Sequence, residues 1–290
     1  CLALSKPSAV APGTPTCGPG GEDATYITAA GKVIDGTRGP FGPNFSNNDF
    51  QGSFGNSNYN SFQAGLRHSG RGVDVMLAYT FSKSIDQASS ISDTSDPFNR
   101  SRLRALSAWD MKHNLVATYT VELPFDRAFG KKARAITQGW SISGITRISS
   151  GFPVTLSTDS DNSLQGSSPN GINNHVLDLP DFTPGPMNFN SNPRNGLPYF
   201  NASLFSQNAL GTPGNASRRS FHGPGSFNFD LTLAKEIKLS EARSLQFRLE
   251  TFNTFNHAQF FGPAAVDGDL DSNLRSEEHT SELQSRLHLV

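Results

Sequence analysis

The stretch Val73–Phe81, "VDVMLAYTF", decides the fold of this chain. Its odd-numbered residues are all apolar or aromatic, and they alternate with Asp74, Met76, Ala78 and Thr80. In an extended backbone successive side chains point to opposite faces, so this alternation gives one apolar face and one mainly polar face. The stretch therefore predicts a β-strand that separates two different environments.

Five further segments show the same period of two, some less cleanly, at residues 59–68, 113–123, 139–149, 226–239 and 245–255. Residues 69–72, "SGRG", predict a tight hairpin between the first two strands. We expect the fourth strand to continue through Phe152, Val154 and Leu156, although Ile145 falls out of phase. With 22 Phe, 27 Gly and 18 Pro, the composition also favours an all-β chain with long loops.

The connections between these strands alternate in length. Residues 69–72 and 240–244 are short and 124–138 are intermediate, whereas 82–112 are long and 157–225 very long. All long connections therefore fall on one edge of an antiparallel meander, as in outer-membrane barrels with long extracellular loops. Strands of about nine to eleven residues also match a tilted bilayer crossing. We predict an all-β fold, part of a transmembrane outer-membrane β-barrel.

The two faces of the strands allow two architectures. In a membrane barrel the apolar face meets lipid and the polar face lines the lumen, with aromatic girdles at both interfaces. The aromatic residues near predicted strand ends fit such girdles: Tyr79, Phe81, Trp140, Phe152, Phe227 and Phe229. The alternative is a secreted soluble β-sandwich, a glycan-binding or adhesin module, in which apolar faces pack on each other. The sandwich explains the one-sided loops less well.

Bulk properties exclude several classes of protein. The net charge is -1 and only 17% of residues are charged, which argues against nucleic acid as a partner. No signal peptide is visible, and no apolar run is long enough for a transmembrane helix. The chain begins with Cys1, as a processed lipoprotein would, but a start within a gene is favoured. Pairing of Cys1 with Cys17 is left open by the sequence.

No catalytic constellation is present, so we expect no enzyme, no catalytic residue, no cofactor and no metal. The sequence has no nucleophile elbow, no Walker loop and no H-E-x-x-H helix. Five histidines are scattered without metal-ligand spacing: His68, His113, His175, His222 and His257. Each is interpreted as a loop or strand-end residue.

Two charged groups invite comparison with binding sites. Asp86, Asp93 and Asp96 in "DQASSISDTSD" could hold Ca²⁺, but their spacing favours a solvated acidic loop. Arg248 and Glu250 face Asp230 and Glu236 on the preceding strand if the register allows. We favour an ordinary cross-strand charge pair. Pairing of Arg248 with Glu250, or of either with a plug domain in a lumen, is the alternative.

The long loop at 157–225 is rich in Asn, Gly and Pro and carries four separated aromatic residues, Phe182, Phe189, Tyr199 and Phe200. Such a composition suits carbohydrate or another polar ligand. It equally suits turn-forming sequence. The ligand is therefore left unknown.

Five segments carry a family resemblance: "NYNSFQAGLRH", "LAYTFSKSIDQAS", "AWDMKHNLVATYTVELPF", "GWSISGITRISSGFPVT" and "FHGPGSFNFDLTLAKEIKLSEARSLQFRLETFNTFNHAQF". In this order they resemble the C-terminal part of the barrel of TonB-dependent receptors, in the Oar-like branch. The resemblance implies a plugged barrel of about twenty-two strands. It also implies energy-coupled uptake of a small-molecule, glycan or peptide ligand, with outer-membrane lipid and the TonB complex as partners. Signalling or secretion roles stay open.

The chain departs from this family pattern in lacking the plug, the TonB-contacting segment and the closing strand. We therefore expect a non-functional fragment that forms an open curved sheet with unpaired edges. Residues 1–57 are interpreted as an extracellular loop region or the start of the fragment. Residues 58–263 are assigned to barrel strands and loops, and residues 264–274 to a truncated last loop.

The final segment, residues 275–290, is unlike the rest of the chain. "RSEEHTSELQS" (Arg275–Ser285) resembles, residue for residue, the translation of a common sequencing adapter, and "RLHLV" would be sequence beyond it. Eleven consecutive matches make coincidence improbable. We therefore predict that this helix-like tail is an artefact, to be excluded from fold reasoning.

Overall fold

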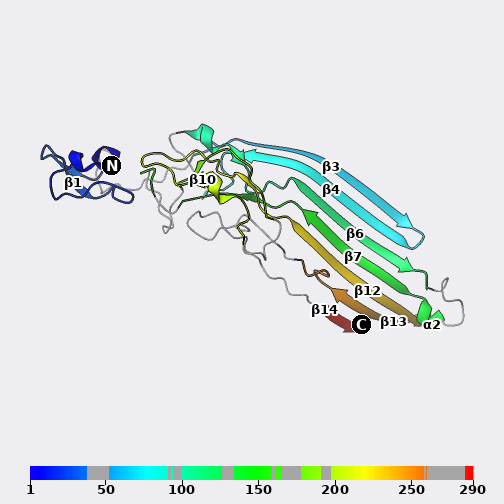
Figure 1. The fold of residues 1–290 in the computed structure, drawn as a ribbon. Helices are drawn as coiled ribbons and strands as arrows, with labels where there is room; N and C mark the ends of the chain where they lie inside the picture. Colours follow the sequence, from blue (N-terminus) through cyan, green and yellow to red (C-terminus); the bar gives the residue numbers. More distant parts are fainter. Residues whose placement is uncertain are drawn as a thin grey trace.

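The computed structural model describes residues 1–37, 52–90, 93, 99–125, 134–158, 161–164, 178–190, 197–257, 259 and 285–289. These residues form a small N-terminal unit, one long sheet, and a group of irregular segments at one end of the sheet (Figure 1). Within them, no helix is both long and apolar enough to cross a membrane.

The long sheet is an antiparallel meander, as predicted. Its strand order is β14-β13-β12-β7-β6-β4-β3, and the two-residue strand β5 pairs with β4 outside this path. The strands are β3 (Ser57–Gly70), β4 (Val73–Asp86), β5 (Ala105–Leu106), β6 (His113–Leu123), β7 (Trp140–Ser149), β12 (Ser226–Ser240), β13 (Arg243–Thr251) and β14 (Ser285–Leu289). All six strands predicted from the sequence are present.

The hairpin between β3 and β4 is longer and tighter than predicted. The two strands pair in continuous register from Ser57 opposite Asp86 to Gly70 opposite Val73. Only Arg71 and Gly72 join them, and both have positive φ, at 55° and 75°. A two-residue turn with two positive φ values matches the right-handed twist of the flanking strands, which explains the preference for glycine here.

The predicted continuation of the fourth strand is wrong. β7 ends at Ser149, and the chain leaves the sheet at Gly151, where a Cβ atom would lie 2.2 Å from the Gly223 carbonyl oxygen. Val154 instead belongs to β8 (Pro153–Val154), which pairs with β11 (Phe221–His222) in a separate two-stranded ladder. Only glycine permits this close approach of two backbone segments. The alternation of apolar and polar residues therefore could not predict where the chain leaves the sheet.

The sixth strand also ends earlier than predicted, at Thr251 rather than near residue 255. Asn253 has a φ of 45°, and its side chain accepts a hydrogen bond from the His257 N–H and donates one to the His257 carbonyl. The Thr254 N–H then bonds the Phe229 carbonyl of β12 at 2.8 Å. This turn folds the chain back onto β12 and ends the ladder.

Connection lengths alternate along the meander as predicted. The β3–β4 and β12–β13 turns are short, and the β6–β7 connection carries only the one-turn helix α2 (Arg134–Thr137) among its described residues. The opposite edge, called here the loop edge, carries the long β4–β6 and β7–β12 connections (Figure 1). They contain η4 (Arg100–Leu103), β8, β9 (Asp181–Phe182), η7 (Ala202–Leu204), β10 (Phe205–Ser206) and β11.

The β7–β12 connection is folded around its own apolar core, which we call the cap core. It consists of Val154, Leu156, Leu179, Phe200, Phe205, Ala216 and Phe221. The described parts of residues 87–112 and 150–225 are called the cap. The cap core lies outside the sheet, whose strands show mostly intermediate or exposed side chains. Burial is therefore concentrated at the loop edge.

The N-terminal unit, residues 1–37, is closed by a disulfide between Cys1 and Cys17, whose Cα atoms are 5.2 Å apart. The pairing that the sequence left open is thus formed. The unit contains η1 (Leu2–Leu4), η2 (Pro7–Ala9) and the hairpin of β1 (Thr25–Ile27) and β2 (Val33–Asp35). Leu4, Val10, Cys17 and Tyr26 form its small core.

Candidate functional site

The polar face of the sheet is hollowed into a groove of about 730 Å³. Each of five neighbouring strands lends it residues that share one face: Asp74 and Met76, Thr118 and Thr120, Ser143 and Ile145, Asp230 and Thr232, Glu250 and the adjoining Phe252. Arg67 adds a positive charge from β3. Ile145, which fell out of phase in the sequence, therefore points its side chain to the polar face.

The register of the strands arranges these side chains in rows. Asp74, Thr120, Ser143, Thr232 and Glu250 lie opposite one another on successive strands. The Thr120 and Ser143 hydroxyl oxygens are 3.0 Å apart, within hydrogen-bonding distance. The groove thus offers hydroxyl and carboxylate groups to a polar molecule.

The other face of the sheet is apolar and is not covered by a second sheet within the described residues. Phe62 and Leu66 are 62% and 61% exposed, and they lie opposite Phe81 and Leu77 on β4. A soluble sandwich requires such faces to pack against each other. That requirement is not met by the described part of the chain.

Aromatic residues border this apolar face at both ends. At the loop edge, the His113 ring lies 5.2 Å from Phe81 and its Nδ1 is 2.8 Å from the Tyr79 hydroxyl oxygen. Phe227 and Phe229 lie on the same edge, with ring centroids 4.8 Å apart. At the opposite end of the strands, called here the turn edge, the ring of Trp140 meets that of Phe125 edge to face. Of the predicted girdle residues, Phe152 alone lies outside the long sheet, against Trp109.

Lys235 lies on the apolar face, at its turn edge. Its ammonium group lies 5.6 Å from the centre of the Trp140 ring and donates a hydrogen bond to the Gln138 carbonyl. The butyl chain therefore lies along apolar surface while the charge reaches a polar partner at the edge, as lysines do at membrane interfaces.

These features together describe a membrane-spanning wall: apolar outside, polar inside, aromatic at both borders and long connections on one edge only. The family model for an outer membrane beta-barrel domain matches residues 9–281. The chain belongs to this family. No curated protein and no solved structure matches the chain. This outer membrane beta-barrel protein therefore lies in the outer membrane, with its apolar face toward lipid and its polar face toward the lumen.

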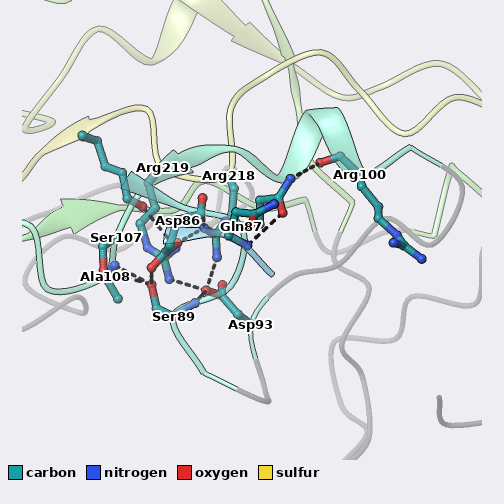
Figure 2. A network of polar contacts seen from close by, with 11 residues as sticks. Asp86, Gln87, Ser89, Asp93, Arg100, Ser107, Ala108, Arg218 and Arg219 are labelled. Atoms are coloured by element: carbon teal, nitrogen blue, oxygen red, sulfur yellow. Dashed lines mark hydrogen bonds and ion pairs between the residues drawn. The ribbon is translucent and has the colours of Figure 1, made fainter. Parts of the chain in front are cut away.

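The cap of the barrel protein contains a buried network of charges (Figure 2). Arg218 is only 1% exposed and pairs with two carboxylates, those of Asp86 and Asp93. Its Nη2 atom also donates to the Asp86 carbonyl oxygen at 3.1 Å. Arg219 lies beside it, with Nη2 2.9 Å from the Asp93 carboxylate. The network joins residues more than 120 positions apart in the sequence.

Asp86 and Asp93 thus do not belong to a solvated acidic loop. The prediction of a solvated loop is wrong for Asp86 and Asp93, because arginines of the other long connection bury and neutralise both; Asp96 lies outside the described residues. Burial raises the pKa of the Asp86 carboxyl, but hydrogen bonds from two serines and Arg218, and the charge of Arg218, leave the pKa below its ordinary value.

The predicted histidines are dispersed over the structure. His68 lies on β3, His113 begins β6, and His257 lies in the turn after β13. His222 is placed differently: its Nε2 is 2.7 Å from the Asp110 carboxylate in the cap. His175 lies outside the described residues. No group of three or more potential metal ligands occurs among the residues that the structure describes.

The preferred cross-strand pairing of Arg248 and Glu250 is wrong. On β12 these residues lie opposite Ala234 and Thr232, so neither of the predicted partners, Asp230 and Glu236, faces them. They pair with each other instead, with Nη1 of Arg248 3.3 Å from the Glu250 carboxylate. Asp230 has another role, since its carboxylate accepts a hydrogen bond from the Asn253 N–H at 2.9 Å.

The aromatic residues of the long loop do not form an exposed ligand platform. Phe200 is 2% exposed, and Phe182, Tyr199 and Phe200 pack in or against the cap core. Phe189 alone of the four is half exposed, and its ring packs on Tyr199 and Phe221. These aromatic side chains are not available as a platform because a loop of this length can bury its apolar groups against one another.

Arg218 and Arg219 were not singled out from the sequence. A signal for them was present, because they form the only adjacent basic pair in residues 157–225. Their partners lie in the other long connection, and no periodic pattern links the two connections.

Proposed function

We propose that this chain forms part of the wall of a TonB-dependent outer-membrane receptor that takes up a ligand across the membrane. The observation that carries the proposal is the polar groove, which spans six strands on the inner face and has a folded cap at the loop edge above it. A pore-forming barrel without energy coupling would need no family-like motifs of the TonB-dependent type. Five such motifs occur in order along this chain.

In this proposal the groove contacts either a polar ligand or the plug that blocks the lumen. Asp74, Asp230 and Glu250 supply carboxylates, and the hydroxyl groups of the same rows supply donors and acceptors. The chain's own residues bind and guide rather than catalyse, so the protein is proposed to be no enzyme. The plug domain itself and the segment that contacts TonB would be formed by residues other than those of this chain. Nucleic acid is not proposed as a partner.

Uptake can be tested with the complete gene in a Gram-negative host that lacks competing receptors. A panel of ferric chelates, cobalamin, oligosaccharides and peptides serves as labelled probes, each measured with TonB present and with TonB deleted. We expect accumulation of one probe class only when TonB is present. A receptor that sits in the outer membrane, cannot be cross-linked to TonB and transports its probe equally without TonB would contradict the proposal.

We also propose that residues 275–290 derive from a translated sequencing adapter. The described part of this segment is the strand β14, whose register places Leu287 and Leu289 opposite Leu249 and Phe247. An unpaired strand edge accepts any segment of alternating residues. The pairing therefore says nothing about the origin of the segment. Amplification and sequencing of the genomic locus would decide, and a genomic sequence encoding "RSEEHTSELQS" would refute the proposal.

A further inference from the structure

The two long connections of the loop edge contact each other through charged side chains. Arg218 and Arg219 belong to the β7–β12 connection, whereas Asp86 ends β4 and Asp93 follows in the β4–β6 connection. Figure 2 shows the guanidinium groups between the two carboxylates, with Ser89 and Ser107 beside them. Ser89 donates to Asp86 through its hydroxyl at 2.6 Å and to Asp93 through its N–H at 2.8 Å.

Further contacts cross between the same connections. The His222 ring meets the Asp110 carboxylate, and Arg102 donates from Nη2 to the Pro213 carbonyl at 2.9 Å. Asp110 is also tied to the sheet, because its carboxylate accepts a hydrogen bond from the Ser84 N–H of β4. The contact between the connections is therefore extended and is anchored on one strand.

The two connections differ in how they could be ordered alone. The cap core is built entirely from residues 154–221, all in the β7–β12 connection. The described part of the β4–β6 connection contributes only two buried apolar residues, Ala105 and Ala108. Two alanines bury too little apolar area to offset the entropy of ordering a segment of this length. Beyond the pairing of β5 with β4 and the backbone hydrogen bonds of Ser107 and Lys112 to β4, its order therefore depends on its polar contacts with the neighbouring connection.

Arg218 is the central contact, because both ends of its guanidinium group are used. Its Nη2 atom pairs with Asp86 and its Nη1 atom with Asp93, so one planar, always charged group bridges the two carboxylates. Both carboxylates are largely buried, and Asp93 also pairs with Arg219, so loss of Arg218 would leave the buried charge of Asp86 without a cationic partner.

We propose that the described parts of the two long extracellular connections open and close as a single unit, coupled through Arg218. In this arrangement no movement of the β4–β6 connection occurs without movement of the β7–β12 connection. A ligand arriving from outside therefore meets one cap fixed to β4 rather than two independent loops.

Amide hydrogen exchange of the full-length protein in lipid vesicles tests the coupling. The reporters are the N–H groups of Ser107 and Ala108 in one connection, and of Ala216 and Ser220 in the other, all of which are hydrogen-bonded. In the unmodified protein we expect both sets to open with the same equilibrium constant, as members of one cooperative unit do. Different opening constants in the two sets would already overturn the proposal.

The variant Arg218→Met then removes the ion pairs that couple the two connections. Both sets should exchange faster by one common factor, on the order of a hundredfold or more, since an uncompensated buried charge is left behind. Arg219→Met removes one ion pair and should accelerate both sets by a smaller common factor. Arg243→Met, at the exposed β12–β13 turn, is the matched control and should change neither set.

The outcomes separate coupling from simple stabilisation. If Arg218→Met accelerates only Ala216 and Ser220, then Arg218 stabilises its own connection and the proposal is wrong. If neither set responds, the buried ion pairs contribute no coupling and the proposal is equally wrong. Amides of β6 and β7 report on the barrel itself, and they should keep their protection in every variant.

Discussion

The long sheet and the cap differ in where their apolar side chains lie. The sheet is regular, pairs in almost unbroken register, and exposes large apolar side chains such as Phe62 and Leu66. The cap has only two-residue strands, yet it contains the larger apolar core and the buried ion pairs. Lipid takes the place of a packing partner for the sheet, whereas the cap lies in water and must bury its own apolar groups.

The largest loss of stability is expected when a large side chain of the cap core is truncated. Phe200 packs against Phe221, with ring centroids 4.8 Å apart, and against Phe205 at 5.7 Å. Phe200→Ala should destabilise the cap by about 3–5 kcal/mol through lost burial and the cavity that remains. Limited proteolysis of the cap measures the loss. Phe62→Ala, on the lipid-facing side, should leave cap cleavage unchanged; equal sensitivity at both sites would remove the distinction between the two regions.

A charge in the middle of the apolar face should have the next largest effect. Leu77 lies between Leu66 and Ala117 on this face, so Leu77→Arg should destabilise the folded barrel in vesicles by about 2–4 kcal/mol. Met76→Arg, one residue away on the groove side, is the matched control and should cost much less. Urea unfolding in lipid vesicles gives both values. Similar losses for the two variants would mean that the faces are assigned wrongly.

A moderate effect is expected where the sheet ends at the loop edge. Asn253→Ala removes two side-chain hydrogen bonds and places alanine at a φ of 45°, which together should cost about 1–3 kcal/mol. Asn253→Gly tolerates the positive φ but also lacks the hydrogen bonds, so it should recover part of the loss. If the glycine variant is no better than the alanine variant, backbone strain has no role in ending β13.

The smallest effect is the pH dependence of the cap. Because the pKa of Asp86 is lower in the folded protein than in the unfolded chain, its contribution to stability is complete above the ordinary aspartate pKa of about 4. The contribution is lost as the pH falls through the folded-state pKa. Cap proteolysis with an acid-active protease should therefore increase below about pH 4. Asp86→Asn should weaken this increase, whereas an unchanged acid response would assign it to another group.

The sheet was largely predictable because its rule is local. The bounds of β6 are those predicted, residues 113–123, and the six long strands followed from alternation within ten or so residues, whereas β5 and β14 were not predicted. The strand ends near Gly151 and Asn253 were not predicted from the alternation of side chains. The first depends on the close approach of two backbone segments, and the second on hydrogen bonds of the Asn253 side chain. The cap was missed because its contacts join Asp86 to Arg218, which are 132 residues apart. A pattern within a short window contains no information about such a pairing.

The disulfide of the N-terminal unit makes the protein a reporter of its own export. Cys1 and Cys17 can join only in an oxidising compartment, so the bond marks molecules that have crossed the inner membrane. The described residues contain no other cysteine, and no free thiol remains once the bond has formed. A thiol-reactive label applied to denatured cell extracts would therefore mark only copies still awaiting secretion, and the labelled fraction would measure the efficiency of export.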